Sequence, residues 1–277
     1  MFEGFTLSSP RWLVALLLAF LVGACSSDNQ KALPDRPVEE LYNSAMDKLG
    51  ESDYRGAATA FDDVDRQHPY SVWATKAQIM GAYSLYQAQK YDDAILALDR
   101  FIQLHPGNRD AAYAYYLKAL CYYVQIVDVG RDQKVTDKAL KALEELIRRF
   151  PESRYARDAR LKLDLTRDHL AGKEMEIGRW YEQRGQYLAA INRFRRVVDN
   201  YQTTTHVPEA LHRLTECYLS LGIVDEARSS AAVLGHNYPG SEWYQDSYAL
   251  LTGGPNDVNP DDQPKKGWMA RVIGALF

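Results

Sequence analysis

The sequence has little cysteine and none of the common catalytic motifs. Only three of the 277 residues are cysteine, and no two of them have the spacing of a zinc-binding pair. A His-Glu-x-x-His helix, a glycine-rich phosphate loop and a Gly-x-Ser-x-Gly elbow are also absent, and the six histidines are scattered along the chain. These absences exclude the recognisable metal, nucleotide and nucleophile sites. The sequence therefore predicts a binding protein, not an enzyme.

Charge of one sign and long apolar runs are lacking as well. The chain has 33 basic and 37 acidic residues, for a net charge of -4, and this balance gives no general attraction to nucleic acid. The apolar run Trp12–Val22 has eleven residues, whereas a helix needs about 20 to cross a bilayer. We therefore expect no nucleic-acid partner, and we interpret the apolar run as part of a signal peptide.

The N-terminus has the features of a lipoprotein signal. A basic residue precedes the apolar run and small residues end it, as in signal peptides. Val22–Cys25 resembles a bacterial lipobox, which implies that Cys25 is lipidated and becomes the first residue of the mature chain. The residue after Cys25 is Ser26. In such lipoproteins an Asp at this position would redirect the sorting of the protein, so the resemblance implies that this chain is sorted to the outer membrane. We expect residues 1–24 to be removed and residues 25–37 to be a lipidated tether. A plain signal peptide cleaved nearby is the alternative.

A helical repeat organises most of the remaining chain. Alanine lies twelve residues before each of five marker positions, and eight residues before them lies a bulky apolar residue in four repeats and alanine in the fifth. The markers are Pro69, Pro106, Pro151, Gln202 and Pro239. Alanine allows a neighbouring helix to approach closely, and proline stops a helix because it lacks an N–H group. The pattern resembles the tetratricopeptide repeat (TPR), whose unit is about 34 residues.

The repeats predict an all-α fold, a TPR-like α-solenoid of five helix pairs. Repeats 1–3 occupy residues 38–151, and repeats 4 and 5 with a capping helix occupy residues 152–251. We expect residues 252–277 to be a disordered tail with a short amphipathic end, because the tail begins with many Gly, Pro and Asp residues. An ordinary helical bundle is the alternative fold.

Two of the repeats are longer than the others. The third contains a charged insertion at residues 128–136, which we interpret as either a solvated connection or a partner contact through Arg131 and Asp132. The fourth begins with an elongated first helix, expected over residues 154–184 and about 45 Å long at 1.5 Å per residue. We expect the two glycines in this helix to bend it.

The first helices of the pairs would line the concave face of such a solenoid. The first three of them carry large, mostly aromatic side chains at helical spacing: Tyr42, Met46, Ile79, Tyr83, Tyr86, Tyr116 and Tyr123. We expect these seven side chains to form a groove for an extended peptide with aromatic side chains. For each tyrosine taken alone, a place in the core between helices is the alternative.

Several local motifs indicate one family of repeat lipoproteins. They are Pro69-Tyr70-Ser71, Arg131-Asp132-Gln133, and a pattern in the fourth repeat that runs from Leu165 to Arg193. With the lipobox, they resemble the BamD family, lipoprotein subunits of the β-barrel assembly machinery (BAM). Gln202, where the family usually has proline, and the tail are departures from that family's pattern.

The resemblance implies a protein at the periplasmic face of the outer membrane. In that family the N-terminal repeats receive unfolded β-barrel proteins, and the C-terminal repeats dock on a POTRA domain of BamA in a complex with other BAM lipoproteins. No catalysis and no cofactor other than the covalent lipid are implied. A TPR lipoprotein that scaffolds peptidoglycan or cell-division enzymes remains an alternative, as does an enzyme with an unrecognised site.

The fourth repeat supplies the candidate BamA contact. Ala190 and Phe194 belong to the apolar stripe of its second helix, whereas Arg193 lies off that stripe. On the resemblance, we expect Arg193, with Arg184 and Tyr187 nearby, to contact BamA.

Overall fold

The computed structural model describes residues 36–252, which form a chain of helices. The predicted signal peptide, Cys25 and the tail from residue 253 onward lie outside the described residues. In chain order the helices are α2 (Val38–Gly50), α3 (Tyr54–Gln67), α4 (Val72–Gln87), α5 (Tyr91–Leu104), α6 (Ala111–Tyr123), α7 (Lys134–Arg149), α8 (Arg154–Glu182), α9 (Tyr187–Asn200), α10 (Val207–Ser220), α11 (Val224–Asn237) and α12 (Glu242–Thr252). The all-α prediction is confirmed for this part of the chain.

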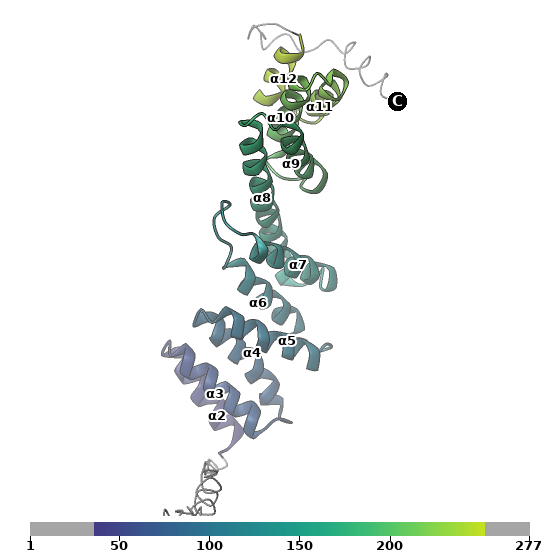
Figure 1. Cartoon of the computed structure of the whole chain (residues 1–277). Coiled ribbons are helices and arrows are strands. Elements are labelled where there is room, and N and C mark those ends of the chain that lie inside the picture. Colours follow the sequence, from purple (N-terminus) through teal and green to yellow (C-terminus); the bar gives the residue numbers. More distant parts are fainter. Residues whose placement is uncertain (1–35, 253–277) are drawn as a thin grey trace, which may run out of the picture.

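The helices stack in chain order into an elongated molecule (Figure 1). Each helix packs against the next, and α2, α4, α6 and α8 also contact one another in succession. These four helices therefore form one continuous face. The long helix α8 connects the end of the molecule that holds α2–α7 with the end that holds α9–α12 (Figure 1). Within residues 36–252, no helix is both long and apolar enough to cross a membrane.

Four of the turns between helices share one geometry. Each has a residue with a left-handed backbone, φ between 58° and 74°, at Ser52, Gln89, Gly185 and Gly222. The N–H of the following residue donates to a carbonyl in the last turn of the preceding helix, with N–O distances of 2.9–3.0 Å. This is the Schellman arrangement that ends many helices. The connection between α6 and α7 differs, because a ten-residue segment, 124–133, replaces the tight turn.

The repeat pattern sets the core. All five alanines of the pattern are fully buried, and the residues four positions later are at most 2% exposed. They are Ala57, Ala94, Ala139, Ala190 and Ala227, followed by Phe61, Leu98, Leu143, Phe194 and Ala231. In four of the five repeats a small and a large buried residue thus follow each other at the contacts between helices, as the spacing predicts. Cys121 and Cys217 are free, buried thiols.

The glycines of α8 serve close packing. The helix is continuous over its 29 residues. A Cβ atom added at Gly178 would lie 2.4 Å from Cε1 of Phe194, and one at Gly172 would lie 3.2 Å from Nε2 of His206. Distances below 3.0 Å are not tolerated, so Gly178 is required for the Phe194 ring to fit. The structure thus gives Gly178 a packing role, and the bend predicted at the two glycines stays a prediction.

Some helix ends differ from those that the sequence suggests. The insertion predicted over residues 128–136 is partly helical, since α7 already begins at Lys134 and Thr136 is buried. Thr136 Oγ1 donates to the Gln133 side chain at 2.8 Å, which fixes the first turn of α7. At the other end of the described residues, α12 includes Thr252, so the predicted tail begins one residue too early.

Candidate functional site

A hollow of about 520 Å³ opens on the face formed by α2, α4, α6 and the start of α8. We call it the N-terminal hollow. It is lined by Tyr42, Lys76, Ile79, Met80, Tyr83, Arg109, Asp110, Tyr113, Arg154 and Tyr155. Four tyrosines and three cations thus surround one space with a single carboxylate among them. Aromatic and cationic groups together suit a peptide that carries aromatic side chains and negative charge.

The aromatic wall of the hollow is held in place by neighbouring groups. The Tyr155 ring lies 5.4 Å from the ring of Tyr113 and stacks 5.1 Å from that of Tyr116. The hydroxyl of Tyr116 donates to Asp158 at 2.7 Å. Burial raises the pKa of Tyr113 to about 12, so its hydroxyl remains protonated and available as a donor. The wall is therefore preorganised before any ligand binds.

The cations of the hollow keep their charged ends open to solvent. The Arg109 side chain is 80% exposed, and its Nε atom lies 3.5 Å from Asp110. Arg154 donates to the Tyr155 hydroxyl at 2.6 Å and lies 4.8 Å from the centre of that ring. Lys76 lies 4.8 Å from the Trp73 ring. Because Asp110 is the one acid in the lining, the hollow has an excess of positive charge.

The residues expected in the groove lie in different places. Tyr42, Ile79 and Tyr83 line the N-terminal hollow, and Tyr116 stacks behind Tyr155. The other three lie outside the lining: Met46 is exposed on α2, Tyr86 packs against Tyr91, and Tyr123 lies under Lys162. The structure thus places three of the seven side chains in the lining of the N-terminal hollow and a fourth, Tyr116, behind that lining.

The three cations of the hollow are not among the residues that the sequence pattern predicts for the site. Arg109 and Arg154 each lie three residues after a marker proline, Pro106 and Pro151. This shared repeat position was a signal for both, because equivalent positions in stacked repeats lie on the same face. Nothing comparable in the sequence indicated Lys76.

The three candidate BamA-contact residues have three different sets of neighbours. Nη1 of Arg193 lies 3.0 Å from Oε2 of Glu174 on α8, and its side chain is 29% exposed. Arg184 instead lies 3.7 Å from the centre of the exposed Trp180 ring. Tyr187 is half-buried against the core of α9 and α10. Arg193 therefore already joins two helices within the chain, which the sequence did not indicate.

The insertion between α6 and α7 folds back onto α8. Nζ of Lys173 donates to the carbonyl of Gly130 at 3.2 Å, and the side-chain amide of Gln133 donates to three carbonyls of the loop. Arg131 and Asp132 are exposed. A second hollow, of about 390 Å³, lies between this loop, the middle of α8 and His206. Among residues 36–252, no group of three or more potential ligands could hold a metal ion.

Comparison with known proteins identifies the family. The family model YfiO, described as an outer membrane lipoprotein, matches residues 34–234. The chain is 48% identical over 262 residues to the outer membrane protein assembly factor BamD of Caulobacter vibrioides, covering 94% of this chain and 85% of that relative. It is 47% identical over 236 residues to BamD of Rickettsia prowazekii, covering 85% of this chain and 94% of that relative. A TPR protein of Thermus thermophilus aligns with a TM-score of 0.36 and 18% identity, covering 79% of this chain and all of the other. This chain therefore belongs to the BamD (YfiO) family of outer membrane lipoproteins.

Proposed function

We propose that this chain is a non-catalytic assembly factor for outer membrane β-barrel proteins. Two relatives that are 47% and 48% identical are named outer membrane protein assembly factors. We further propose that a lipid on Cys25 anchors the chain at the periplasmic face of the outer membrane. Each buried methylene of an acyl chain contributes about 0.8 kcal/mol, so several acyl chains give durable anchoring.

The N-terminal hollow is the observation that carries the proposal for substrate recognition. We propose that it receives the C-terminal segment of an unfolded barrel protein, which offers aromatic side chains and a terminal carboxylate. Aromatic side chains would pack against Tyr83 and Tyr113, and the carboxylate would accept hydrogen bonds from Arg109 and Arg154. Guanidinium–carboxylate pairs are often bidentate, which fixes the orientation of the bound peptide.

The C-terminal end of the solenoid is the proposed site for a POTRA domain of BamA. Trp and Arg are the side chains most enriched at the centres of protein interfaces. The exposed pair of Trp180 and Arg184 at the end of α8 and the cation Arg193 on α9 provide both types.

A charge swap tests whether Arg193 contacts BamA. Arg193→Glu is expected to abolish BamA copurification, but it also places a second carboxylate beside Glu174 and disturbs the packing of α8 on α9. The double variant Arg193→Glu, Glu174→Arg restores an ion pair between the helices while keeping the charge at position 193 reversed. Glu174→Arg alone is measured beside it, because Glu174 also lies 3.4 Å from Arg196. Copurification is expected to remain lost in the double variant. Recovery there would mean that Arg193 only braces the two helices. Arg195→Glu, at an exposed position of the same helix, is the matched control.

Depletion of the chain tests the function itself. Cells depleted of it are expected to lose outer membrane porins several-fold, because barrels that are not assembled are degraded. Quantitative mass spectrometry of the outer membrane gives the measurement. Unchanged porin levels together with a septation or cell-wall defect would instead support a scaffold for peptidoglycan or cell-division enzymes.

The depleted strain also provides a control for the anchor. Complementation with Cys25→Ala is expected to place the chain in the soluble periplasmic fraction, whereas the wild type sediments with the outer membrane. If the Cys25→Ala variant still sediments with the outer membrane, the proposed lipid anchor is wrong. The porin measurement would still test the assembly role.

A further inference from the structure

The last helix, α12, covers the end of the solenoid through a fitted contact. It packs on α10 and α11. The ring of Tyr244 is buried against Gly235 of α11, where an added Cβ would lie 2.4 Å from Cε2 of the ring. The ring of Trp243 lies 5.3 Å from that of His212 on α10. Aromatic packing therefore holds this helix on both neighbours.

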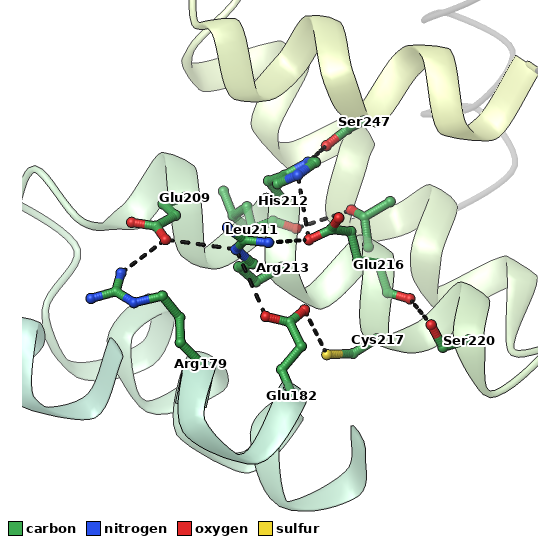
Figure 2. A network of polar contacts seen from close by, with 11 residues as sticks. Arg179, Glu182, Glu209, Leu211, His212, Arg213, Glu216, Cys217, Ser220 and Ser247 are labelled. Carbon is green, nitrogen blue, oxygen red and sulfur yellow. Dashed lines mark hydrogen bonds and ion pairs between the residues drawn. The ribbon is translucent and has the colours of Figure 1, made fainter. Parts of the chain in front are cut away.

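His212 is the polar centre of the contact (Figure 2). Its side chain is 6% exposed, and Nε2 lies 3.4 Å from Oε2 of Glu216. Nδ1 lies 2.8 Å from the hydroxyl of Ser247, a fully buried residue of α12. This hydrogen bond ties α12 to α10 in a place from which water is excluded. Such a place favours a neutral imidazole over a charged one.

The charges that face His212 come from α10 and α12. They are Glu216, Arg213 and Glu209 of α10, and Asp246 of α12. Burial has the largest effect and lowers the pKa of His212, and the nearby Arg213 lowers it further, against the opposing effect of the carboxylates.

Most of these carboxylates already form ion pairs with other cations. Arg213 donates to Glu216 at 2.8 Å and lies 3.6 Å from Glu209. Arg179 of α8 donates to Glu209 at 2.9 Å (Figure 2). Glu182 of α8 also faces Arg213, at 3.8 Å. A proton on His212 would thus add positive charge to a network in which Arg213 and Arg179 already pair with the carboxylates.

We propose that His212 makes α12 a pH-sensitive cap. With a neutral ring the helix is docked on α10 and α11. Protonation of the ring favours a state in which α12 detaches and the ring reaches water. The proposal rests on the contacts of α12 and does not depend on the peptide or BamA contacts proposed above.

The direction of the pH effect follows from linkage. In the undocked state the ring has its ordinary pKa of about 6.5, and in the docked state the pKa is lower. Docking is therefore at full strength above about pH 6.5 and weakens as the pH falls below that value, by at most about tenfold per pH unit for one proton. Burial raises the pKa of Glu182 of α8, and the charged groups that shift it lie on α10, so the contribution of His212 to α12 docking is isolated with variants.

Hydrogen exchange of the α12 amides in the full chain tests the cap. After correction for intrinsic rates, α12 exchange is expected to increase up to about tenfold between about pH 7.5 and about pH 5.5, while α3 amides stay constant. His212→Gln keeps a hydrogen-bonding group for Ser247 but cannot ionise, so its α12 exchange is expected to be the same at both pH values. His236→Gln, at an exposed position of α11, is the matched control and should keep the pH response.

Gly235→Ala supplies the reference for the undocked state. Its added Cβ cannot coexist with the Tyr244 ring in place, so fast α12 exchange is expected at both pH values. Equal wild-type exchange at both pH values, or an unchanged pH response in His212→Gln, would overturn the proposal. If the His212→Gln substitution itself undocks α12, an NMR titration of the His212 ring in the wild-type chain is the decisive measurement. A midpoint equal to that of the exchange change supports the cap, and a different midpoint overturns it.

Discussion

Truncation of Phe194 to alanine is expected to lower the free energy of unfolding by about 3–5 kcal/mol. The ring is fully buried in a cluster that joins α8, α9 and α10. One edge of the ring fits against Gly178, and Ala190 and Val197 pack beside it in the same cluster. Alanine would lose the transfer free energy of the ring and leave a cavity, because the surrounding helices can only partly close it.

Urea unfolding followed by circular dichroism measures this loss. Leu188→Ala on the same helix is the control, since Leu188 is 67% exposed and surface substitutions change stability by about 0.5 kcal/mol or less. Equal unfolding midpoints for the two variants would contradict the role of Phe194 as the centre of the C-terminal core.

The repeat could be predicted from the sequence because spacing alone encodes it. Alanine twelve residues before each marker is fully buried in all five repeats, including the repeat where Gln202 replaces proline. The contact partners could not be predicted in the same way. A glycine in a helix is compatible with a bend, a close contact or both, and only the packed structure shows the close contact of Gly178 with the ring of Phe194.

In the candidate sites, too, the sequence predicted which face of a helix a residue lies on but not which residue it contacts. Tyr42, Ile79 and Tyr83 recur at helical spacing on first helices, and they lie in one hollow. The ion pair of Arg193 with Glu174 joins residues 19 positions apart on different helices. The apolar stripe of α9 predicted only that Arg193 lies off the core side, and the identity of the facing residue depends on how α8 and α9 pack.

The cations at the two ends of the solenoid have different surroundings, and this decides which of them are available to a charged ligand. In the C-terminal network the cations Arg179 and Arg213 are matched by carboxylates of the same chain. In the N-terminal hollow Lys76 and Arg154 lie on aromatic rings, and Asp110 is the one acid in the lining. Charge in the first network contributes to internal structure, whereas charge in the hollow remains available to a ligand with a carboxylate.

Replacing Arg109 and Arg154 together by glutamine is therefore expected to weaken binding of a C-terminal barrel peptide by about 100-fold. A hydrogen bond to a charged group contributes about 1.5–3 kcal/mol, and about 1.4 kcal/mol corresponds to a factor of ten in Kd. Fluorescence anisotropy with a synthetic peptide that ends in phenylalanine measures the change. The pair Arg148→Gln, Arg157→Gln is the matched control, because it removes the same charge from exposed positions of α7 and α8 outside the hollow.

The same peptide with a C-terminal amide separates recognition of the carboxylate from a general loss of charge. The amide is expected to bind the wild-type chain about as weakly as the acid binds the double variant, and the double substitution is expected to cost the amide little. The two substitutions and the missing carboxylate then form a cycle whose coupling reports the direct contact. An equal loss for acid and amide would mean that the guanidinium groups act only through the long-range field, and the terminal carboxylate would have to bind elsewhere on the face formed by α2, α4, α6 and α8.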